Sequence, residues 1–317
     1  MNVLVTGATG FVGQTLVRRL VLHEGDDVRC AIRKQRNGLE VATHVHVVGE
    51  VDSSTDWQRA LVDVDCVVHL AARVHVMKDR EKDPMAEFRR VNVEGTTALV
   101  RQAIAAGVSR LILLSTVKVN GEGGPGAPST HVPYRETDVA APCDDYALSK
   151  YEAECALQSV AGASGMEWVI VRPPLVYGPG VRANFAALKR VVRRGYPLPL
   201  GAVNNQRSLV ALDNLVDLIV TCSTHPQAAN QTFLVSDGQD LSTTELVRGM
   251  AQAAGVPARL LPVPVWALQA GALLLGKGDA VQRLCGNLQV DISKARRLLD
   301  WVPPVSVAEG LRRAMAG

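Results

Sequence analysis

The stretch NVLVTGATGFVG at residues 2–13 decides the fold of this chain. Its first apolar residues predict a strand, and the apolar positions of residues 10–23 have helical spacing. Between strand and helix, Gly7 permits a tight turn, Gly10 lets the backbone approach a pyrophosphate, and Gly13 allows close helix–strand packing. The N–H groups at the start of the helix would face the phosphates. This strand–glycine turn–helix order predicts a dinucleotide-binding site.

Apolar runs of strand length alternate with helix-length amphipathic segments downstream of the glycine turn. The near-continuous apolar run at residues 66–71 is typical of a strand that is buried on both faces. This alternation predicts an α/β fold with a doubly wound parallel (Rossmann) sheet. Further strands are expected at 27–32, 45–48, 110–115 and 168–171, and helices at 84–106 and 146–161.

The regular alternation stops after Arg172. Glycine and proline interrupt residues 172–180 and 195–201, and the later helices have irregular connections. We therefore expect a nucleotide-binding domain at 1–172 and a smaller C-terminal substrate-binding lobe at 173–317. Residues 208–225 read as a strand plus a helix that we expect to return to the first domain.

The composition narrows the class of protein. Of the 317 residues, only 4% are aromatic, and the net charge is +3, so we expect no nucleic-acid partner. The six cysteines are far apart, with no zinc-ligand spacing, so we expect free thiols, no metal site and a cytoplasmic protein. The apolar run at residues 265–275 has about half of the roughly twenty residues that a membrane span needs. It predicts a buried or surface-binding helix.

The end of the second expected strand bears on the ribose of the cofactor. NAD-selective sites usually place a carboxylate there, whereas this chain has Ala31-Ile32-Arg33-Lys34. An arginine suits a 2′-phosphate through paired hydrogen bonds, although a solvated basic loop is the alternative. Arg33 and Lys34 therefore favour NADP(H), with NAD(H) as the alternative.

A phenol and an ammonium stand four residues apart in the segment that runs from Tyr146 to Lys150. On a helix this spacing puts both on one face, where the cation is expected to lower the pKa of the tyrosine. Upstream, Ser115 and Thr116 bring hydroxyls to the end of a buried strand. The combination predicts acid–base chemistry at the edge of the sheet.

Nearly the whole chain resembles the extended short-chain dehydrogenase/reductases, in particular the NAD-dependent epimerase/dehydratase group. By this resemblance Tyr146 is the acid/base at the reacting oxygen, Lys150 binds the nicotinamide ribose, and Thr116 hydrogen-bonds the substrate oxygen. Thr116 is preferred to Ser115 by counting back from residues 119–121, where the family often has Val-Tyr-Gly. The matching motifs are residues 6–13, 69–72, 92–96, 115–116, 146–150, 171–180 and 298–303.

The glycine turn and the resemblance also imply the residues that bind the two ligands. Arg207 is expected to face a substrate diphosphate with Arg283 as a second phosphate ligand, while Arg73 and Asn184 are candidate substrate contacts. Glu50 and Val51 resemble the family's acidic–aliphatic pair beside the adenine. The remaining cofactor contacts are expected from Gly7, Thr9, Gly10, Phe11, Val12, Gly13, Leu70, Ala71, Ala72, Pro173 and Val176, together with Tyr146 and Lys150.

The residues around Thr116 distinguish the reactions that this group performs. Dehydratases of the group follow the catalytic hydroxyl with an Asp-Glu pair, and this chain has Val117-Lys118. Known sugar 4-epimerases carry the acidic residue that is missing near Arg33. Residues 115–122 and the C-terminal apolar helix resemble bacterial reductases that act on UDP-2-acetamido-2,6-dideoxy-4-hexuloses. This resemblance makes NADPH-dependent C4 keto-reduction of such a sugar, for O-antigen or other surface polysaccharide, the leading prediction.

Two other functions are kept as alternatives. One is an NAD-dependent UDP-sugar 4-epimerase, which would turn over with no net change in its cofactor. The other is a non-catalytic NADP-sensing regulator, although such proteins typically lose the tyrosine or the lysine and this chain has both. The family also implies a homodimer.

Overall fold

Seven parallel strands form one sheet in the order β3-β2-β1-β4-β5-β6-β9. The computed structural model describes residues 1–35, 42–74, 83–122, 132–181, 183–274, 276 and 278–316. The expected doubly wound sheet is confirmed, and its order changes direction between β1 and β4, where such sheets bind ligands. The strands are β1 (Asn2–Thr6), β2 (Asp27–Ile32), β3 (His44–Val47), β4 (Cys66–His69), β5 (Arg110–Leu114), β6 (Glu167–Arg172) and β9 (Gln231–Leu234).

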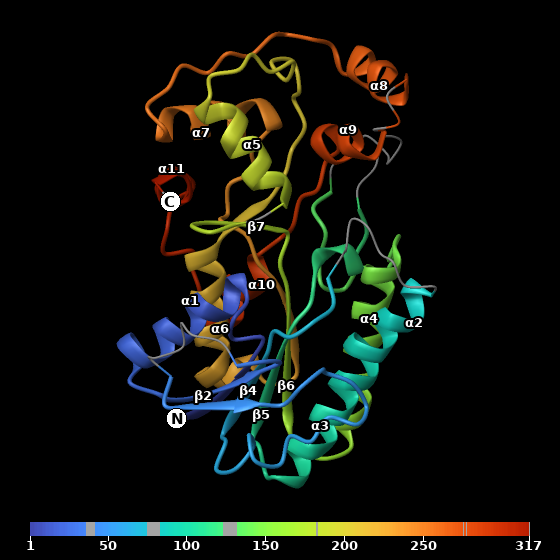
Figure 1. The fold of residues 1–317 in the computed structure, drawn as a ribbon, viewed down its shortest axis with the longest axis vertical. Coiled ribbons are helices and arrows are strands. Elements are labelled where there is room, and N and C mark those ends of the chain that lie inside the picture. Colours follow the sequence, from blue (N-terminus) through green and yellow to red (C-terminus); the bar gives the residue numbers. More distant parts are fainter. Residues whose placement is uncertain are drawn as a thin grey trace.

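Helices cover both faces of this sheet (Figure 1). All four residues of β4 are buried, because apolar cores lie above and below the strand. One face carries α1 (Phe11–Arg19), the π-helical turn η1 (Leu20–Glu24), α6 (Leu212–Thr224) and α10 (Ser293–Leu299). The other carries α2 (Pro84–Phe88), the π-helical segment η2 (Arg89–Glu94), α3 (Gly95–Ala105) and α4 (Asp145–Gly162).

A second cluster of elements follows β6 and has its own apolar core. Its centre is a two-stranded parallel sheet of β7 (Leu175–Tyr177) and β8 (Leu209–Ala211). The buried Tyr177 hydroxyl donates to the Asp237 carboxylate over 2.7 Å, which ties β7 to the chain beyond β9. The surrounding helices are α5 (Ala183–Arg193), α7 (Thr243–Ala253), α8 (Val265–Leu274), α9 (Gly278–Cys285) and α11 (Val307–Ala316).

Within the second half of the sequence, the chain passes from the second cluster back to the helices that cover the large sheet. The segment expected to return, residues 208–225, divides between them: β8 pairs with β7, whereas α6 packs against α1. A further strand, β9, joins the large sheet beside β6. Two short 3₁₀ turns, η3 (Val117–Val119) and η4 (Pro226–Ala228), complete the described elements. None of the helices in the described ranges combines the length and the apolar character that crossing a membrane requires.

Candidate active site

The glycine turn leaves an open cradle at the start of α1. Gly7 has a φ of +65°, and a Cβ there would lie 2.8 Å from the Ala71 nitrogen. A Cβ on Gly13 would lie 2.3 Å from the Gly7 oxygen. Gly10 is the N-cap of α1 and no side chain caps the helix, so its first N–H groups face outward. These residues fit a dinucleotide, whose phosphates need close backbone approach and free amide donors.

A buried histidine holds the end of β4 against this turn. The Thr6 Oγ1 accepts from the amides of Leu70 and Ala71, so its proton is directed to His69 Nδ1, 2.7 Å away. The other ring nitrogen lies 3.0 Å from Thr96 Oγ1. Burial lowers the pKa of His69 to about 3, so the ring is neutral. The network places Leu70 and Ala71, two of the expected cofactor contacts, beside Gly7, and Ala72 follows them in the chain.

Arg33 and Lys34, the two residues expected near the ribose of the cofactor, are exposed just after β2. The Arg33 guanidinium makes a 3.4 Å ion pair with Glu50, and each side chain is more than half exposed. The neighbouring Val51 packs against Gly95, where a Cβ would lie 2.6 Å from its Cγ1. Arg33 of the expected basic pair therefore meets Glu50 of the expected acidic–aliphatic pair at one edge of the sheet.

Two hydroxyls follow β5. Thr116 is the N-cap of η3, and its Oγ1 accepts from the Lys118 amide over 3.3 Å. Ser115 donates its amide to the Val171 oxygen, while its buried Oγ has no hydrogen-bond partner among the described residues. The Val117 amide donates to the Pro173 oxygen over 3.0 Å, which brings another expected cofactor contact to this strand end. The choice between Ser115 and Thr116 stays a prediction.

Tyr146 and Lys150 lie one turn apart at the start of α4. Asp144 caps this helix, since its Oδ1 accepts from the Ala147 amide over 2.7 Å. Its other oxygen accepts from Lys118 Nζ over 2.6 Å. Lys118 lies two residues after Thr116. Its contact with Asp144 therefore brings the end of β5, where Thr116 lies, to the start of α4, where Tyr146 and Lys150 lie.

Burial sets the protonation of both helix residues. Burial, with a smaller contribution from the Asp144 carboxylate, raises the pKa of Tyr146 to about 12. Burial also lowers the pKa of Lys150 to about 8, against the opposing charge of Glu154. The pKa of Tyr146 is therefore raised in this structure and not lowered as its spacing from Lys150 led us to expect, because loss of solvent and a nearby carboxylate both favour the neutral phenol.

A buried ion pair lies behind Lys150. The Glu154 carboxylate, one turn further along α4, accepts from the Arg172 guanidinium at 2.5 Å, and both side chains are less than a tenth exposed. Arg172 also donates to Asn120 Oδ1 over 3.0 Å. This network joins α4 to the end of β6 and places a compensating negative charge near Lys150.

Arg73 lies on the Tyr146 side of the site. Its guanidinium stands 5.6 Å from the centre of the Phe88 ring, which in turn lies 6.1 Å from that of Tyr146. Asn92 holds the segment in place: its side chain accepts from the Arg73 amide and donates to the Arg73 oxygen and to Ser149. The sequence did not reveal that Phe88 would link these residues, because α2 is far from both along the chain.

Arg207 approaches the same region from the second cluster. It donates to the Gly286 oxygen over 3.0 Å. Burial lowers its pKa, and the nearby Glu122 carboxylate opposes that shift. Because Glu122 also pairs with Lys118, Arg207 lies on the same side of the molecule as the end of β5.

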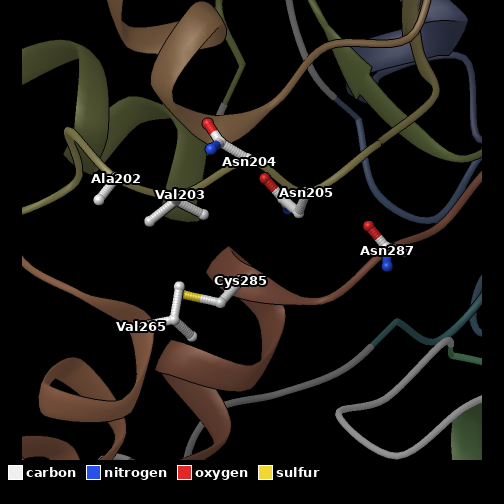
Figure 2. A pocket seen from close by; sticks show the side chains of 7 residues that line it. All are labelled: Ala202, Val203, Asn204, Asn205, Val265, Cys285 and Asn287. Carbon is white, nitrogen blue, oxygen red and sulfur yellow. The ribbon is translucent and has the colours of Figure 1, made fainter. Parts of the chain in front are cut away.

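A pocket of about 290 Å³ adjoins Arg207 through Gly286, whose oxygen also accepts from Asn205 over 2.8 Å. In Figure 2, Asn204 and Asn205 lie across this pocket from Val265 and Cys285. The full lining is Ala202, Val203, Asn204, Asn205, Val265, Cys285 and Asn287.

The other expected contacts are placed less closely. Asn184 is an exposed residue of α5, and Val176 is half-buried on β7. Thr9, Phe11 and Val12 lie at the start of α1, on the glycine turn. Arg283 belongs to α9, but its side chain lies outside the described part of the structure.

Comparison with known proteins gives a consistent result. Residues 3–236 match the NAD dependent epimerase/dehydratase family. A UDP-glucose 4-epimerase of Vibrio cholerae is 49% identical over 316 residues, which cover 98% of this chain and 94% of that protein.

Solved structures show the same fold. UDP-glucuronic acid 4-epimerase from Bacillus cereus, in complex with NAD, superimposes with a TM-score of 0.79 at 21% identity, covering all of this chain and 96% of the other. UDP-glucose 4-epimerase of Thermotoga maritima, with UDP-glucose, gives a TM-score of 0.76 at 24% identity and covers 100% and 98% of the two chains.

Proposed function

Because the chain belongs to the NAD-dependent epimerase/dehydratase family, we propose that it interconverts the C4 epimers of a UDP-sugar with NAD(H). The observation that carries this proposal is the 49% identity to a UDP-glucose 4-epimerase along 98% of the chain. The NAD bound in the Bacillus cereus structure supports the choice of cofactor. The comparisons do not support the preference for NADP(H) that Arg33 and Lys34 suggested.

The chain's own residues supply the proton chemistry. Tyr146 would take the proton of the 4-hydroxyl as C4 is oxidised and return it when the 4-ketone is reduced from its other face. Thr116 would donate a hydrogen bond to the same oxygen. A bound nicotinamide supplies the hydride acceptor and a positive charge that favours the phenolate. Since burial and Asp144 hold the pKa of Tyr146 near 12, the free protein keeps the phenol protonated until ligands bind.

Lys150 would act through its charge and its position. Its ammonium is almost fully buried one turn after Tyr146, where desolvation strengthens its electrostatic effect on nearby atoms. Glu154 favours its charged form, and Arg172 fixes Glu154 in turn. A cation held this way would stabilise the phenolate as the proton leaves.

The substrate would lie between Thr116, Tyr146 and Lys150 on one side and the second cluster on the other. Arg207 would bind the diphosphate, because a guanidinium offers paired donors to phosphate oxygens. The pocket beside Gly286 would take the nucleotide base, with the amides of Asn204 and Asn287 as polar groups. Arg73, on the Tyr146 side, would meet the sugar.

A second candidate keeps the sequence-based prediction of a keto-reductase. No carboxylate follows β2, and the cations Arg33 and Lys34 suit a 2′-phosphate. That enzyme would reduce a UDP-linked 4-keto sugar with NADPH, and a role in surface polysaccharide synthesis and a homodimer stay predictions with it.

One assay separates the two candidates. Purified protein is incubated with UDP-glucose or UDP-N-acetylglucosamine, and the products are resolved by proton NMR while nicotinamide absorbance is followed. An epimerase gives the C4 epimer with no net change in absorbance. Consumption of NADPH with a 4-keto sugar nucleotide, and no epimer from either substrate, would replace the proposal with the reductase.

A further inference from the structure

The helix α8 has an apolar face that no other described part of the chain covers. Nine of its ten residues are apolar or glycine, and Gln269 is the exception. One side of the helix packs inward, since Val265 and Leu268 contact the core of the second cluster and Ala272 is buried. A helix that is apolar all round but buries one side leaves the other for a partner.

The exposed residues of α8 form one continuous stripe. Trp266, Ala270, Leu273 and Leu274 are exposed and follow the i, i+4, i+7, i+8 spacing of a single helix face. Trp266 is 72% exposed, and Leu274 is 89% exposed. Leu261, just before the helix, is 51% exposed and extends the apolar surface.

Two segments at this end of the molecule carry cations and no carboxylates, while the adjacent helix α9 contains Asp279. Neither residues 183–212 nor residues 246–278 contain an aspartate or a glutamate. Backbone hydrogen bonds join the two segments, because Leu198 donates to the Arg259 oxygen and accepts from the Leu261 amide, each over 2.8 Å. In Figure 1, α8 and the end of α5 lie at the same end of the long axis. The exposed arginines of the two segments are Arg190, Arg193, Arg194, Arg248 and Arg259.

We propose that this end of the protein binds the surface of an anionic phospholipid bilayer through the outward stripe of α8. At about 1.5 Å per residue, ten residues span half of a bilayer core, so the helix lies in the interface and does not cross it. An apolar helix face with a tryptophan and flanking arginines suits the boundary between headgroups and acyl chains. The exposed arginines of residues 183–212 and 246–278, two segments without carboxylates, match the negative potential of such a membrane.

Docking would also bring the nucleotide pocket close to the membrane. Val265 begins α8 and lines that pocket, so the bound helix and the pocket share a residue. The binding itself rests on the exposed face and the charge, and its test needs no enzymatic activity.

The experiment measures sedimentation of the full chain with vesicles of phosphatidylcholine, with or without phosphatidylglycerol. Binding is expected only with the anionic lipid, weakening as salt increases. The emission of Trp266 should shift to the blue on binding, whereas the buried Trp57 and Trp301 and the half-buried Trp168 on β6 should show no shift. Leu273→Ser with Leu274→Ser should lower the affinity at least about tenfold.

Matched variants separate the proposal from its rivals. Leu22 on η1 is 64% exposed, so Leu22→Ser removes one exposed leucine far from α8 and should bind like the parent chain. Arg193→Gln with Arg194→Gln should lose affinity for the anionic vesicles. No sedimentation with anionic vesicles would overturn the proposal. So would a dimer that the Leu273/Leu274 double variant dissociates without any vesicle binding, which would make a second copy the partner of α8.

Discussion

The Lys118 ammonium donates a 2.6 Å hydrogen bond to the Asp144 carboxylate and so fastens the end of β5 to the start of α4. One end of this contact lies two residues after Thr116, and the other lies two residues before Tyr146. The same carboxylate caps α4 and raises the pKa of Tyr146. Lys118 therefore has both a positioning and an electrostatic effect on the proposed chemistry.

Replacing Lys118 with methionine should lower kcat about tenfold at neutral pH with a smaller effect on KM. The uncompensated Asp144 charge would favour the neutral phenol. The limb of the pH–rate profile on which the rate rises with pH should therefore move to higher pH. Asp144→Asn keeps a capping side chain but removes the charge, so its profile should move to lower pH. Profiles of kcat/KM for the three proteins check this, and shifts of both variants in the same direction would contradict it.

Gly13→Ala should abolish cofactor binding. The new Cβ would lie 2.3 Å from the Gly7 oxygen, so the turn and α1 cannot keep their present contact. Gly162→Ala is the control, since no atom lies within 4 Å of its added Cβ, and it should raise stability by about 0.5–1 kcal/mol. Fluorescence titration with NADH and thermal melts measure both effects. Normal NADH affinity of the Gly13 variant would exclude the cradle.

Lys150→Met should inactivate the protein yet stabilise its fold. A lysine whose pKa falls from 10.5 to about 8 on folding favours the unfolded, charged state. Wild-type stability should therefore decrease as pH falls from about 10.5 to about 8 and stay lower below that, by ~3 kcal/mol at most. The methionine variant should lack this decrease. Urea melts at pH 7 and pH 10 test this, and equal stabilities of the two proteins at pH 7 would show that Lys150 is not desolvated.

Arg172→Met should destabilise the chain by about 3–5 kcal/mol, because it leaves the Glu154 carboxylate buried without its partner. Adding Glu154→Gln should recover much of that loss, since no buried charge then remains in the pair. Chemical denaturation of the two single variants and the double variant gives the coupling. Additive losses would mean that the two side chains do not stabilise each other.

The sequence contained enough information to predict six of the seven strands of the large sheet, but not β9. Its strands are short apolar runs separated by helix-length segments, and residues 2–13 fix the first turn. Periodicity could not reveal β7 and β8, because three residues are too few to show a period. The expected helix at residues 10–23 begins correctly but widens into a π-helical turn at Leu20.

The site shows a similar division. Tyr146, Lys150 and Thr116 could be selected from the sequence because each occupies a recognisable motif. The Lys118–Asp144 contact spans 26 residues of sequence and depends on how β5 and α4 meet. The direction of the Tyr146 pKa shift depends on burial, which spacing along one helix does not report.

The central claim is that one active site oxidises and re-reduces the same C4 atom. UDP-glucose carrying deuterium at C4 tests it most directly. We predict that the C4 epimer appears with the deuterium retained at C4 and no net change in NADH, and that Tyr146→Phe slows this by about a hundredfold or more. Epimer that has lost the label, or no epimer alongside stoichiometric oxidation of NADPH by a 4-keto sugar nucleotide, would contradict the account.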